Sequence, residues 1–190
     1  MQYGLIAEDT FILRSLPVLI SRLVDLEDDR VECRIMNGKP DFILNFWKSV
    51  KEFQFKYPAM HKVLAVCDAD TECVVALADD LRARATARLG ALPFTLIFHV
   101  IKQELETWWI AESAAISSAT GVAIPFPGGN VEQDVPDPKA YIVGRLAAAK
   151  GTYTNGDAAA AAAAIDLTTL KDRCPGFVRF ARLVVNGEVA

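Results

Sequence analysis

Apolar runs and longer segments with helical periodicity alternate along the first half of the chain. Four runs rich in apolar residues are predicted to be strands, at about residues 3–7, 31–36, 63–67 and 92–101. Each is followed by a segment in which apolar residues recur three or four positions apart, beginning near residues 12, 42, 74 and 103. An acidic turn at residues 27–29 precedes the second strand. This alternation predicts an α/β fold with a four-stranded, mainly parallel sheet and helices on both faces.

The pattern changes after about residue 118. Proline and glycine are frequent over residues 121–137, which is typical of a loop. Helical patterns return over residues 141–149, 158–164 and 177–185, and the alanine run among them has a high helix propensity. We therefore predict an α/β domain over residues 1–115, a loop over residues 116–136, and a helical C-terminal extension over residues 137–190 that packs on the same core.

The segment Arg173–Phe180 near the C-terminus is expected to be structural. Phe177 and Phe180 are three residues apart, so a helix places them on the same face. Pro175 suits the first turn of that helix, where its missing N–H costs nothing.

The composition excludes several classes of protein. The chain has 190 residues, of which 52% are hydrophobic and 23% charged, so it is long and apolar enough for one sizeable core. The chain has 20 Lys and Arg residues and 24 Asp and Glu residues. The resulting formal net charge of -4 excludes nucleic-acid binding by bulk positive charge. The N-terminal segment lacks the features of a signal peptide, and no run approaches a membrane span of about 20 apolar residues. We expect a cytoplasmic protein that does not enter a membrane.

Cysteine, histidine and serine chemistry has little support. The four cysteines, at positions 33, 67, 73 and 174, form no Cys-x-x-Cys pair, and His61 and His99 are the only histidines. Neither a zinc site nor a disulfide is therefore expected. His99 lies in an apolar run, where a packed and hydrogen-bonded histidine is expected. The serines between residues 113 and 118 form no nucleophile–base motif, and Gly128-Gly129 lacks the Lys-Ser/Thr of a phosphate-binding loop.

Acidic residues directly follow three of the four predicted strands. They are Glu8, Asp9, Asp68, Asp70, Glu104 and Glu106. Parallel strands end at one edge of their sheet, where open α/β folds bind ligands, so these carboxylates should converge on one crevice. Their repulsion requires protons or divalent cations, and carboxylate oxygens suit Mg²⁺ or Mn²⁺. An alternative stays open for Asp9, Asp70 and Glu104, because acidic residues after strands also cap helices.

These residues also carry a resemblance to a known family. The runs Gly4-Leu5-Ile6-Ala7-Glu8 and Asp68-Ala69-Asp70 resemble the motifs of a Toprim domain, the metal-dependent module of topoisomerases, primases and OLD-family nucleases. With Glu104–Trp108, Asp137–Lys139 and Arg173–Phe180, nearly the whole chain resembles a Toprim-like bacterial family that is often encoded beside ATPases. The resemblance implies a Toprim/Rossmann-like sheet.

The resemblance implies a role for each matching carboxylate. Glu8 would be the catalytic residue, acting as a general acid/base or as a metal ligand. Asp68 and Asp70 would be the metal-binding pair, with Glu104 and Glu106 as further ligands of Mg²⁺ or Mn²⁺.

One position departs from the Toprim pattern. Toprim domains usually have Gly after the motif glutamate, and this chain has Asp9. Asp9 is thus an accessory candidate, which could add a ligand or obstruct the approach of a phosphate. Lys102 is a second accessory candidate, because a cation is needed near the phosphate, and Arg14 and Lys139 are alternatives for that task.

The expected function is Mg²⁺-dependent phosphodiester cleavage by a metal-dependent nuclease or nicking subunit, the effector of an antiviral defence system that works with an ABC-type or AAA-type ATPase. Two alternatives stay open: a catalytically weak interaction subunit of such an ATPase complex, and a metal-dependent small-molecule phosphohydrolase. The acidic balance favours the alternatives, because a nuclease acting alone normally has a basic track. We expect weak nucleic-acid binding by the isolated chain. Whether the chain forms an oligomer is an open alternative.

Overall fold

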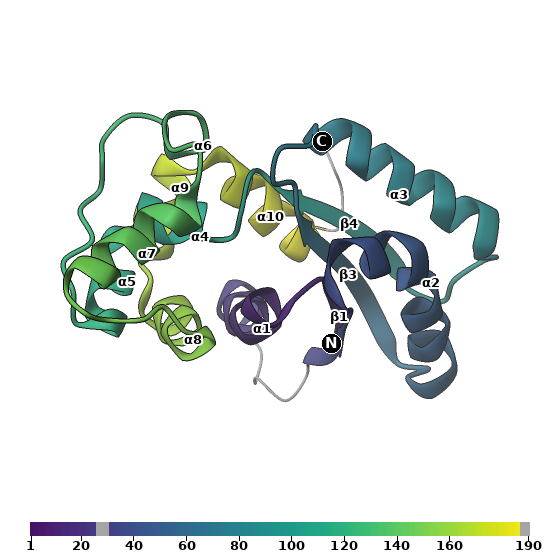
Figure 1. Ribbon diagram of the computed structural model, residues 1–190. Coiled ribbons are helices and arrows are strands. Elements are labelled where there is room, and N and C mark those ends of the chain that lie inside the picture. The colour runs from purple at the N-terminus through teal and green to yellow at the C-terminus, as the bar shows by residue number, and fades with distance from the viewer. Residues whose placement is uncertain (26–30, 187–190) are drawn as a thin grey trace.

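The computed structural model describes residues 1–25 and 31–186, and a four-stranded parallel sheet forms its centre (Figure 1). The strands are β1 (Gln2–Ala7), β2 (Val31–Ile35), β3 (Met60–Asp68) and β4 (Thr95–Ile101). Their order in the sheet is β2-β1-β3-β4, and every neighbouring pair is parallel. The predicted α/β class is confirmed. The acidic turn predicted at residues 27–29 and the last four residues of the predicted extension lie outside the described residues.

Three helices connect the strands and cover both faces of the sheet. They are α1 (Thr10–Val24), α2 (Gly38–Lys56) and α3 (Val74–Arg88). Figure 1 shows α2 and α3 on one side of the sheet and α1 on the other. This arrangement follows from right-handed crossovers: the chain moves one way from β1 to β2, and the opposite way from β2 to β3 and β4.

In the part of the chain described after β4, seven further helices lie on the side of α1 (Figure 1). They are α4 (Glu106–Ala111), α5 (Ser113–Thr120), α6 (Val131–Asp134), α7 (Pro138–Ala148), α8 (Asn155–Ala164), α9 (Leu167–Arg173) and α10 (Pro175–Asn186). The alanine-rich α8 packs closely on α1, and the Arg22 guanidinium donates hydrogen bonds of 2.7 Å to the carbonyls of Ala162 and Ile165. A cation thus satisfies carbonyls at the end of α8 that lack helical partners.

Successive residues of each strand enter two separate cores. Leu5 and Leu64 join the core beneath α1 and the C-terminal helices, whereas Ile6 and Val63 join the core beneath α2 and α3. Because side chains of a strand alternate between faces, a sheet covered on both sides needs apolar residues at nearly every position. This explains the continuous apolar runs that identify β1 and β3 in the sequence.

The last helix closes the first of these cores. Phe180 of α10 is fully buried, with its ring centroid 5.1 Å from that of Trp108 and 5.2 Å from that of His99. Burial lowers the pKa of His99 to about 3, so the ring is neutral. The predicted packing of His99 is present, but the predicted hydrogen bond is missing at Nε2, which has no partner among the described residues.

The C-terminal end of α10 is joined to the beginning of β3. Lys62 is buried on the α1 side of the sheet, and its Nζ donates to the carbonyls of Val184 at 2.7 Å and Val185 at 2.9 Å. The Tyr3 hydroxyl also donates to the carbonyl of Val184, at 3.4 Å. These donors satisfy carbonyls of the last helical turn and fix α10 across the sheet.

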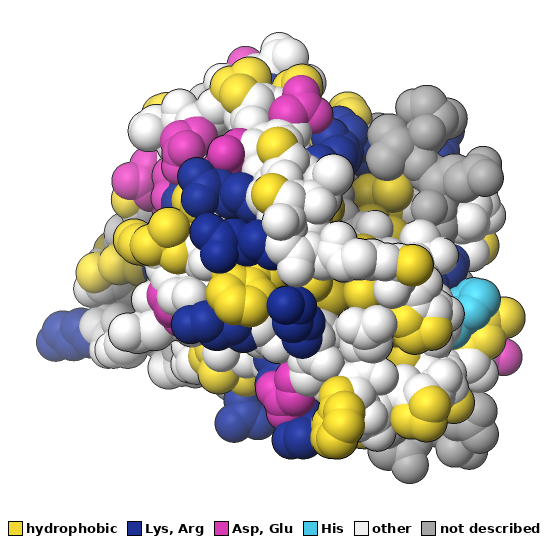
Figure 2. Space-filling model, turned by 90° about the vertical axis from the view of Figure 1, so that its right-hand side faces the viewer, with side chains coloured by type: hydrophobic (Ala, Val, Ile, Leu, Met, Phe, Trp, Pro, Cys, Tyr) yellow, Lys and Arg dark blue, Asp and Glu magenta, His cyan; other side chains and the backbone are white. Residues whose placement is uncertain are grey.

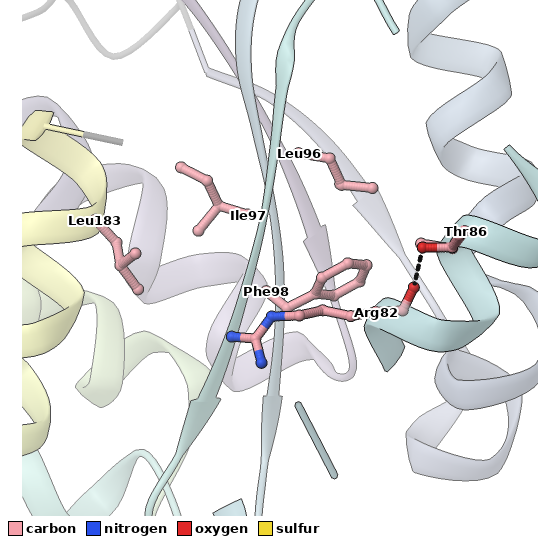
Figure 3. A pocket seen from close by; sticks show the side chains of 7 residues that line it. Arg82, Thr86, Leu96, Ile97, Phe98 and Leu183 are labelled. Carbon is pink, nitrogen blue, oxygen red and sulfur yellow. Dashed lines mark hydrogen bonds between the residues drawn. The ribbon is translucent and has the colours of Figure 1, made fainter. Parts of the chain in front are cut away.

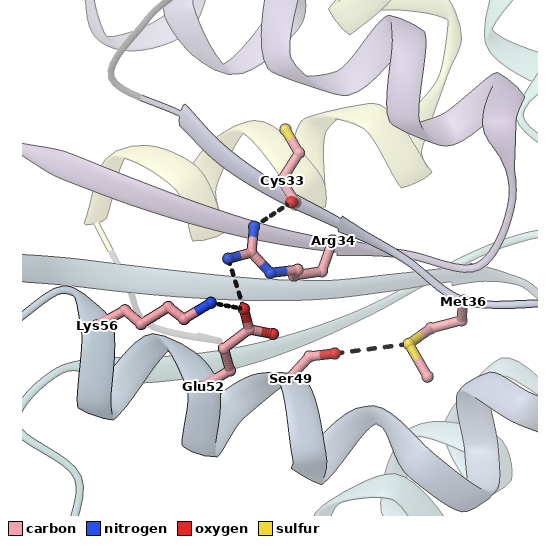
Figure 4. A network of polar contacts seen from close by, with 6 residues as sticks. All are labelled: Cys33, Arg34, Met36, Ser49, Glu52 and Lys56. Carbon is pink, nitrogen blue, oxygen red and sulfur yellow. Dashed lines mark hydrogen bonds and ion pairs between the residues drawn. The ribbon is translucent and has the colours of Figure 1, made fainter.

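Polar contacts join β2 to α2 on the other face. Arg34 donates to Glu52 at 2.8 Å and lies 5.2 Å from the centroid of the Phe53 ring, and Lys56 shares the same carboxylate at 2.7 Å (Figure 4). These ion pairs lower the pKa of Glu52 to about 2.

Some predicted boundaries differ from the structure. β4 begins at Thr95, later than predicted, and the region predicted as a loop over residues 116–136 contains part of α5 and the short helix α6. The side chain of Asn130 accepts a hydrogen bond from the Glu132 N–H at 3.1 Å and caps α6, which a count of prolines and glycines could not indicate. Within the described residues, no helix is long and apolar enough to cross a membrane.

We expect Gly176→Ala to destabilise the protein by about 1–3 kcal/mol, because it would break a buried cap. The Glu132 carboxylate accepts hydrogen bonds from the Gly176 N–H at 2.6 Å and from the Cys174 thiol at 3.0 Å. A Cβ at position 176 would lie 2.5 Å from Glu132 Oε1, so the carboxylate would have to move.

A matched glycine provides the control for this prediction. Gly144 lies inside α7, and an added Cβ would meet nothing within 4 Å. Gly144→Ala should therefore raise the stability by about 0.5–1 kcal/mol, through helix propensity. Urea unfolding of both variants measures the difference, and equal stabilities would contradict the structural role of Glu132.

Candidate functional site

Glu8 and Asp68 lie side by side at the ends of two neighbouring strands whose following helices cover opposite faces of the sheet. Glu8 directly follows β1 and Asp68 ends β3, and these strands are neighbours at the centre of the sheet. The Asp68 N–H donates to Glu8 Oε2 at 3.0 Å, and the Glu8 N–H donates to the Val66 carbonyl at 3.2 Å. After β1 the chain leaves toward one face and after β3 toward the other, so these strand ends form the switch point of the sheet, where open α/β folds bind ligands.

Asp68 is partly buried, and one of its carboxylate oxygens is shielded from solvent. Its Oδ1 has no hydrogen-bond partner among the described residues. Burial raises its pKa well above the usual range, and the negative charges of Glu106 and Glu8 raise it further. An ionised Asp68 is costly unless a proton or a cation compensates it.

Glu106 brings a second buried carboxylate to this edge from the first turn of α4. Its side chain is 2% exposed, and its Oε1 has no hydrogen-bond partner in the described part of the chain. Burial raises the pKa of Glu106 to about 7, although the Lys139 ammonium, 4.0 Å from Oε1, opposes this shift. Glu106 therefore changes its charge near neutral pH.

Unpartnered polar atoms are concentrated around these two carboxylates. Across residues 1–25 and 31–186, nine buried side-chain polar atoms lack a hydrogen-bond partner. Six of them belong to residues that follow the carboxyl ends of the strands or pack beside them: Asp68, Gln103, Glu106, Trp109, Tyr153 and Asn155. Burial and the Glu106 carboxylate raise the pKa of the Tyr153 hydroxyl and Trp109 opposes this shift, so Tyr153, Glu106 and Trp109 adjoin one another. Buried polar atoms are normally paired, so this concentration leaves groups that a bound water, ion or polar ligand would satisfy.

Glu8 adds a third carboxylate to the group, and only one of its two oxygens accepts a hydrogen bond. Oε2 accepts the Asp68 N–H, and Oε1 takes part in no described hydrogen bond. Burial raises the pKa of Glu8, against the opposing effects of the Asp68 N–H and the Lys39 ammonium. Glu8 is therefore held in position and can carry a proton more readily than an exposed glutamate.

Asp70 has a different environment from Asp68. The backbone of Asp70 is left-handed, with φ of 51°, and this ends the alternation of the strand. Its side chain is 53% exposed and accepts a hydrogen bond from Lys39 Nζ at 2.5 Å, while Glu72 lies 3.3 Å from the same nitrogen. The predicted metal-binding pair is thus one partly buried carboxylate and one exposed carboxylate with a cationic partner.

Two of the predicted site residues cap helices. Asp9 accepts a hydrogen bond from the Ile12 N–H at 2.9 Å at the beginning of α1, and Glu104 accepts one from the Lys139 N–H at 2.9 Å at the beginning of α7. The capping role considered for Asp9 is therefore present, whereas Glu104 binds the first turn of α7 and does not cap the helix that follows its own strand. Glu8, Asp68 and Glu106 remain as the carboxylates without such a structural task.

The cations of this edge differ in part from those predicted. Lys139 lies near Glu106, with its Nζ 4.4 Å from the centroid of the Phe11 ring. Lys102 follows β4, and neither Lys102 nor Arg14 forms an ion pair with another described residue. Lys39, absent from the sequence-based candidates, is the cation that contacts Asp70. The sequence could have indicated Lys39, because this residue follows the second predicted strand and therefore lies at the same edge of the sheet as the acidic residues.

The carboxylates do not form a ready-made cation cage. Within the described ranges, no group of three His, Cys, Asp or Glu residues is placed so that it could hold a metal ion. The unpartnered oxygens of Asp68 and Glu106 and the free Oε1 of Glu8 nevertheless fit the chemistry of a hard divalent cation, which prefers carboxylate oxygens.

A pocket on the edge strand is separate from this site. It has a volume of about 340 Å³ and lies between α3, β4 and α10, where Arg82, Phe98 and Leu183 line it (Figure 3). Its lining residues include none of the predicted site residues.

The fold and the acidic edge define an α/β protein with a buried carboxylate group at the switch point of a parallel sheet. No protein-family model, curated protein sequence or solved structure matches the chain. The resemblance to Toprim domains therefore stays a prediction that rests on the short motifs of the sequence.

Proposed function

We propose that the protein is a Mg²⁺- or Mn²⁺-dependent enzyme that cleaves phosphodiester bonds, with Glu8, Asp68 and Glu106 at its centre. The concentration of unpartnered buried polar atoms around Asp68 and Glu106 carries this proposal. The resemblance to Toprim nucleases supports it, as does the position of Glu8 and Asp68 at the switch point. We place the enzyme in the cytoplasm, as a nuclease or nicking subunit that works with an ATPase in antiviral defence.

The roles of the residues follow from their environments. A bound divalent cation would supply polarisation of the phosphoryl oxygen and activation of water. Asp68 and Glu106 would hold it through their unpartnered oxygens. Glu8 is fixed by the Asp68 N–H and has a raised pKa, which suits a group that accepts and returns a proton. Lys39 and Lys139 bring positive charge to this edge of the sheet, where a phosphate would need it.

A catalytically weak subunit of an ATPase complex is the second candidate. The structural contacts of the other carboxylates favour it. Asp9 and Glu104 accept hydrogen bonds from the first turns of helices, and Asp70 pairs with Lys39. Three of the six predicted acidic residues would then maintain the structure.

Thermal melting and cleavage assays with Mg²⁺ and Mn²⁺ separate these candidates. The cation should raise the Tm of the wild type, because it binds only the folded state. Asp68→Asn should abolish both this shift and the cleavage of plasmid DNA or RNA. Glu8→Gln should abolish cleavage and keep part of the shift, since Glu8 acts mainly on a proton.

Asp166→Asn is the matched control for these variants. Asp166 caps α9 and accepts a hydrogen bond from the Thr169 N–H at 2.6 Å, a task that asparagine performs equally well. This variant should keep the Tm shift and the cleavage of the wild type. Metal-independent melting and no cleavage by the wild type would overturn the enzymatic proposal and leave the interaction subunit.

A further inference from the structure

The outer side of α2 combines exposed apolar side chains with cations. We call the group the aromatic-basic stripe, and its members are Leu44, Trp47, Lys48, Lys51 and Phe55 of α2 and Arg88 of α3. Leu44 is 55% exposed and Phe55 is 89% exposed. The charged groups of Lys48, Lys51 and Arg88 lie 5.6, 5.1 and 5.3 Å from the centroid of the Trp47 ring. Figure 2 views this side of the molecule, and Lys and Arg side chains gather there around hydrophobic ones.

The spacing of the stripe places its α2 members on one helical face. Positions 44, 48, 51 and 55 follow one another at intervals of three or four residues, and position 47 is three residues from 44 and four from 51, so their side chains share one side of the helix. Phe42, Phe46, Val50 and Phe53 form the buried face of α2, and of the stripe only Trp47 also packs, partly buried, against the same core. Leu44 and Phe55 are large apolar groups that are exposed beside cations and have no task in the core, which indicates a binding surface.

The three cations of the stripe are free of acidic partners. Lys48, Lys51 and Arg88 form no ion pair within residues 1–25 and 31–186. Neighbouring cations on the same helices do: Lys56 pairs with Glu52 (Figure 4), Arg82 pairs with Asp79, and Arg84 pairs with Asp80. The stripe is therefore a local positive surface on a chain whose net charge is -4.

We propose that the aromatic-basic stripe binds a single strand of nucleic acid. Surfaces for single strands combine cations that contact the phosphates with aromatic rings on which bases stack. The three free cations would supply the first component, and Phe55 and Trp47 the second. The choice of nucleic acid over another polyanion rests on the proposed function, which this surface would supply with substrate.

The course of α2 connects the stripe to the acidic edge. The helix begins at that edge, where the Gly38 N–H donates to the Glu8 carbonyl at 3.2 Å and Lys39 contacts Asp70. Trp47 is eight residues beyond Lys39, which corresponds to about 12 Å along a helix with a rise of about 1.5 Å per residue. A strand bound along the stripe would therefore approach Glu8 and Asp68 at one end.

Fluorescence anisotropy with labelled (dT)20 and (rU)20 tests the proposal in the presence of EDTA, where metal-dependent cleavage cannot contribute. Contacts to three phosphates predict a slope of about -2 for log Kobs against log[salt] on a single strand. The triple variant Lys48→Ala/Lys51→Ala/Arg88→Ala should bring this slope close to zero and weaken binding at low salt by about tenfold or more. Phe55→Ser should weaken binding at least about fivefold, through the loss of stacking.

A second triple variant controls for net charge. Lys56→Ala/Arg82→Ala/Arg84→Ala removes the same number of positive charges from the same helices, but from cations that are already paired. This control should keep the slope of the wild type. Equal losses in the two triple variants would overturn the proposal, because bulk charge and not the stripe would then explain binding.

Two further outcomes would also overturn it: no binding of either oligonucleotide, and binding only to vesicles of phosphatidylserine and phosphatidylcholine, which would make the stripe a membrane surface. The proposed function is judged separately. Binding that persists in the Asp68→Asn variant, together with a wild type that cleaves nothing with Mg²⁺ or Mn²⁺, would support the stripe and refute the enzyme. Cleavage by the wild type, together with stripe variants that bind the oligonucleotides as tightly as the wild type does, would support the enzyme and refute the stripe.

Discussion

Glu106→Gln should raise the free energy of unfolding at pH 8 by about 3 kcal/mol, the equivalent of lowering the pKa of this carboxyl from about 7 to its ordinary value of 4.5. The folded protein keeps a proton on Glu106 between about pH 4.5 and pH 7, whereas the unfolded chain has released it. Folding therefore takes up a proton in this range, so wild-type stability falls as the pH rises through it. Below this range both states are protonated, and above it the penalty is complete.

Urea unfolding at pH 5 and pH 8 measures this effect. The wild type should lose stability between the two values, and the raised pKa of Asp68 adds a loss of the same sign. Glu106→Gln should have a flatter profile. Glu72→Gln is the control, because its side chain is 51% exposed and its replacement should change the stability by less than about 0.5 kcal/mol. A wild type that is equally stable at both pH values would show that Glu106 does not retain its proton on folding.

Phe180→Ala should lower the free energy of unfolding by about 3–5 kcal/mol, the usual cost of removing a fully buried aromatic ring. Phe180 contacts Trp108, Phe177 and His99, which come from three different elements, so its loss leaves a cavity that they cannot easily fill. Val185→Ala, at a side chain that is 50% exposed on the same helix, should change the stability much less. Unchanged thermal stability of Phe180→Ala would contradict the structural role of the Arg173–Phe180 segment.

The order of strands and helices is predictable from the sequence for a physical reason. A parallel strand covered on both sides must be apolar at nearly every position, so β1 and β3 are recognisable without knowledge of the fold. Their neighbourhood at the centre of the sheet brings Glu8 and Asp68 together, because both follow the ends of such strands.

The task of each carboxylate depends on contacts that the sequence does not reveal. Glu104 caps α7, which is 35 residues further along the chain, and Glu132 binds the beginning of α10 from 44 residues away. The pairing of Lys39 with Asp70 accompanies a left-handed backbone at a residue that is not glycine. No periodicity or short motif encodes such contacts, so the six acidic candidates could not be ranked before the structure was known.

The contacts between Lys62, Tyr3 and the end of α10 have a consequence for biosynthesis. Tyr3 and Val184 are 181 positions apart, so Tyr3 is synthesised long before the residue that it contacts. The α2 and α3 face of the sheet can be covered once the residues up to β4 have left the ribosome, but the opposite face lacks α10 until residues 175–186 have been made. At about 5–20 residues per second, the remaining chain takes several seconds to appear. During that interval the apolar face of the nascent sheet is open to chaperones, and a ribosome stalled before the last helix would release a chain unable to close its core.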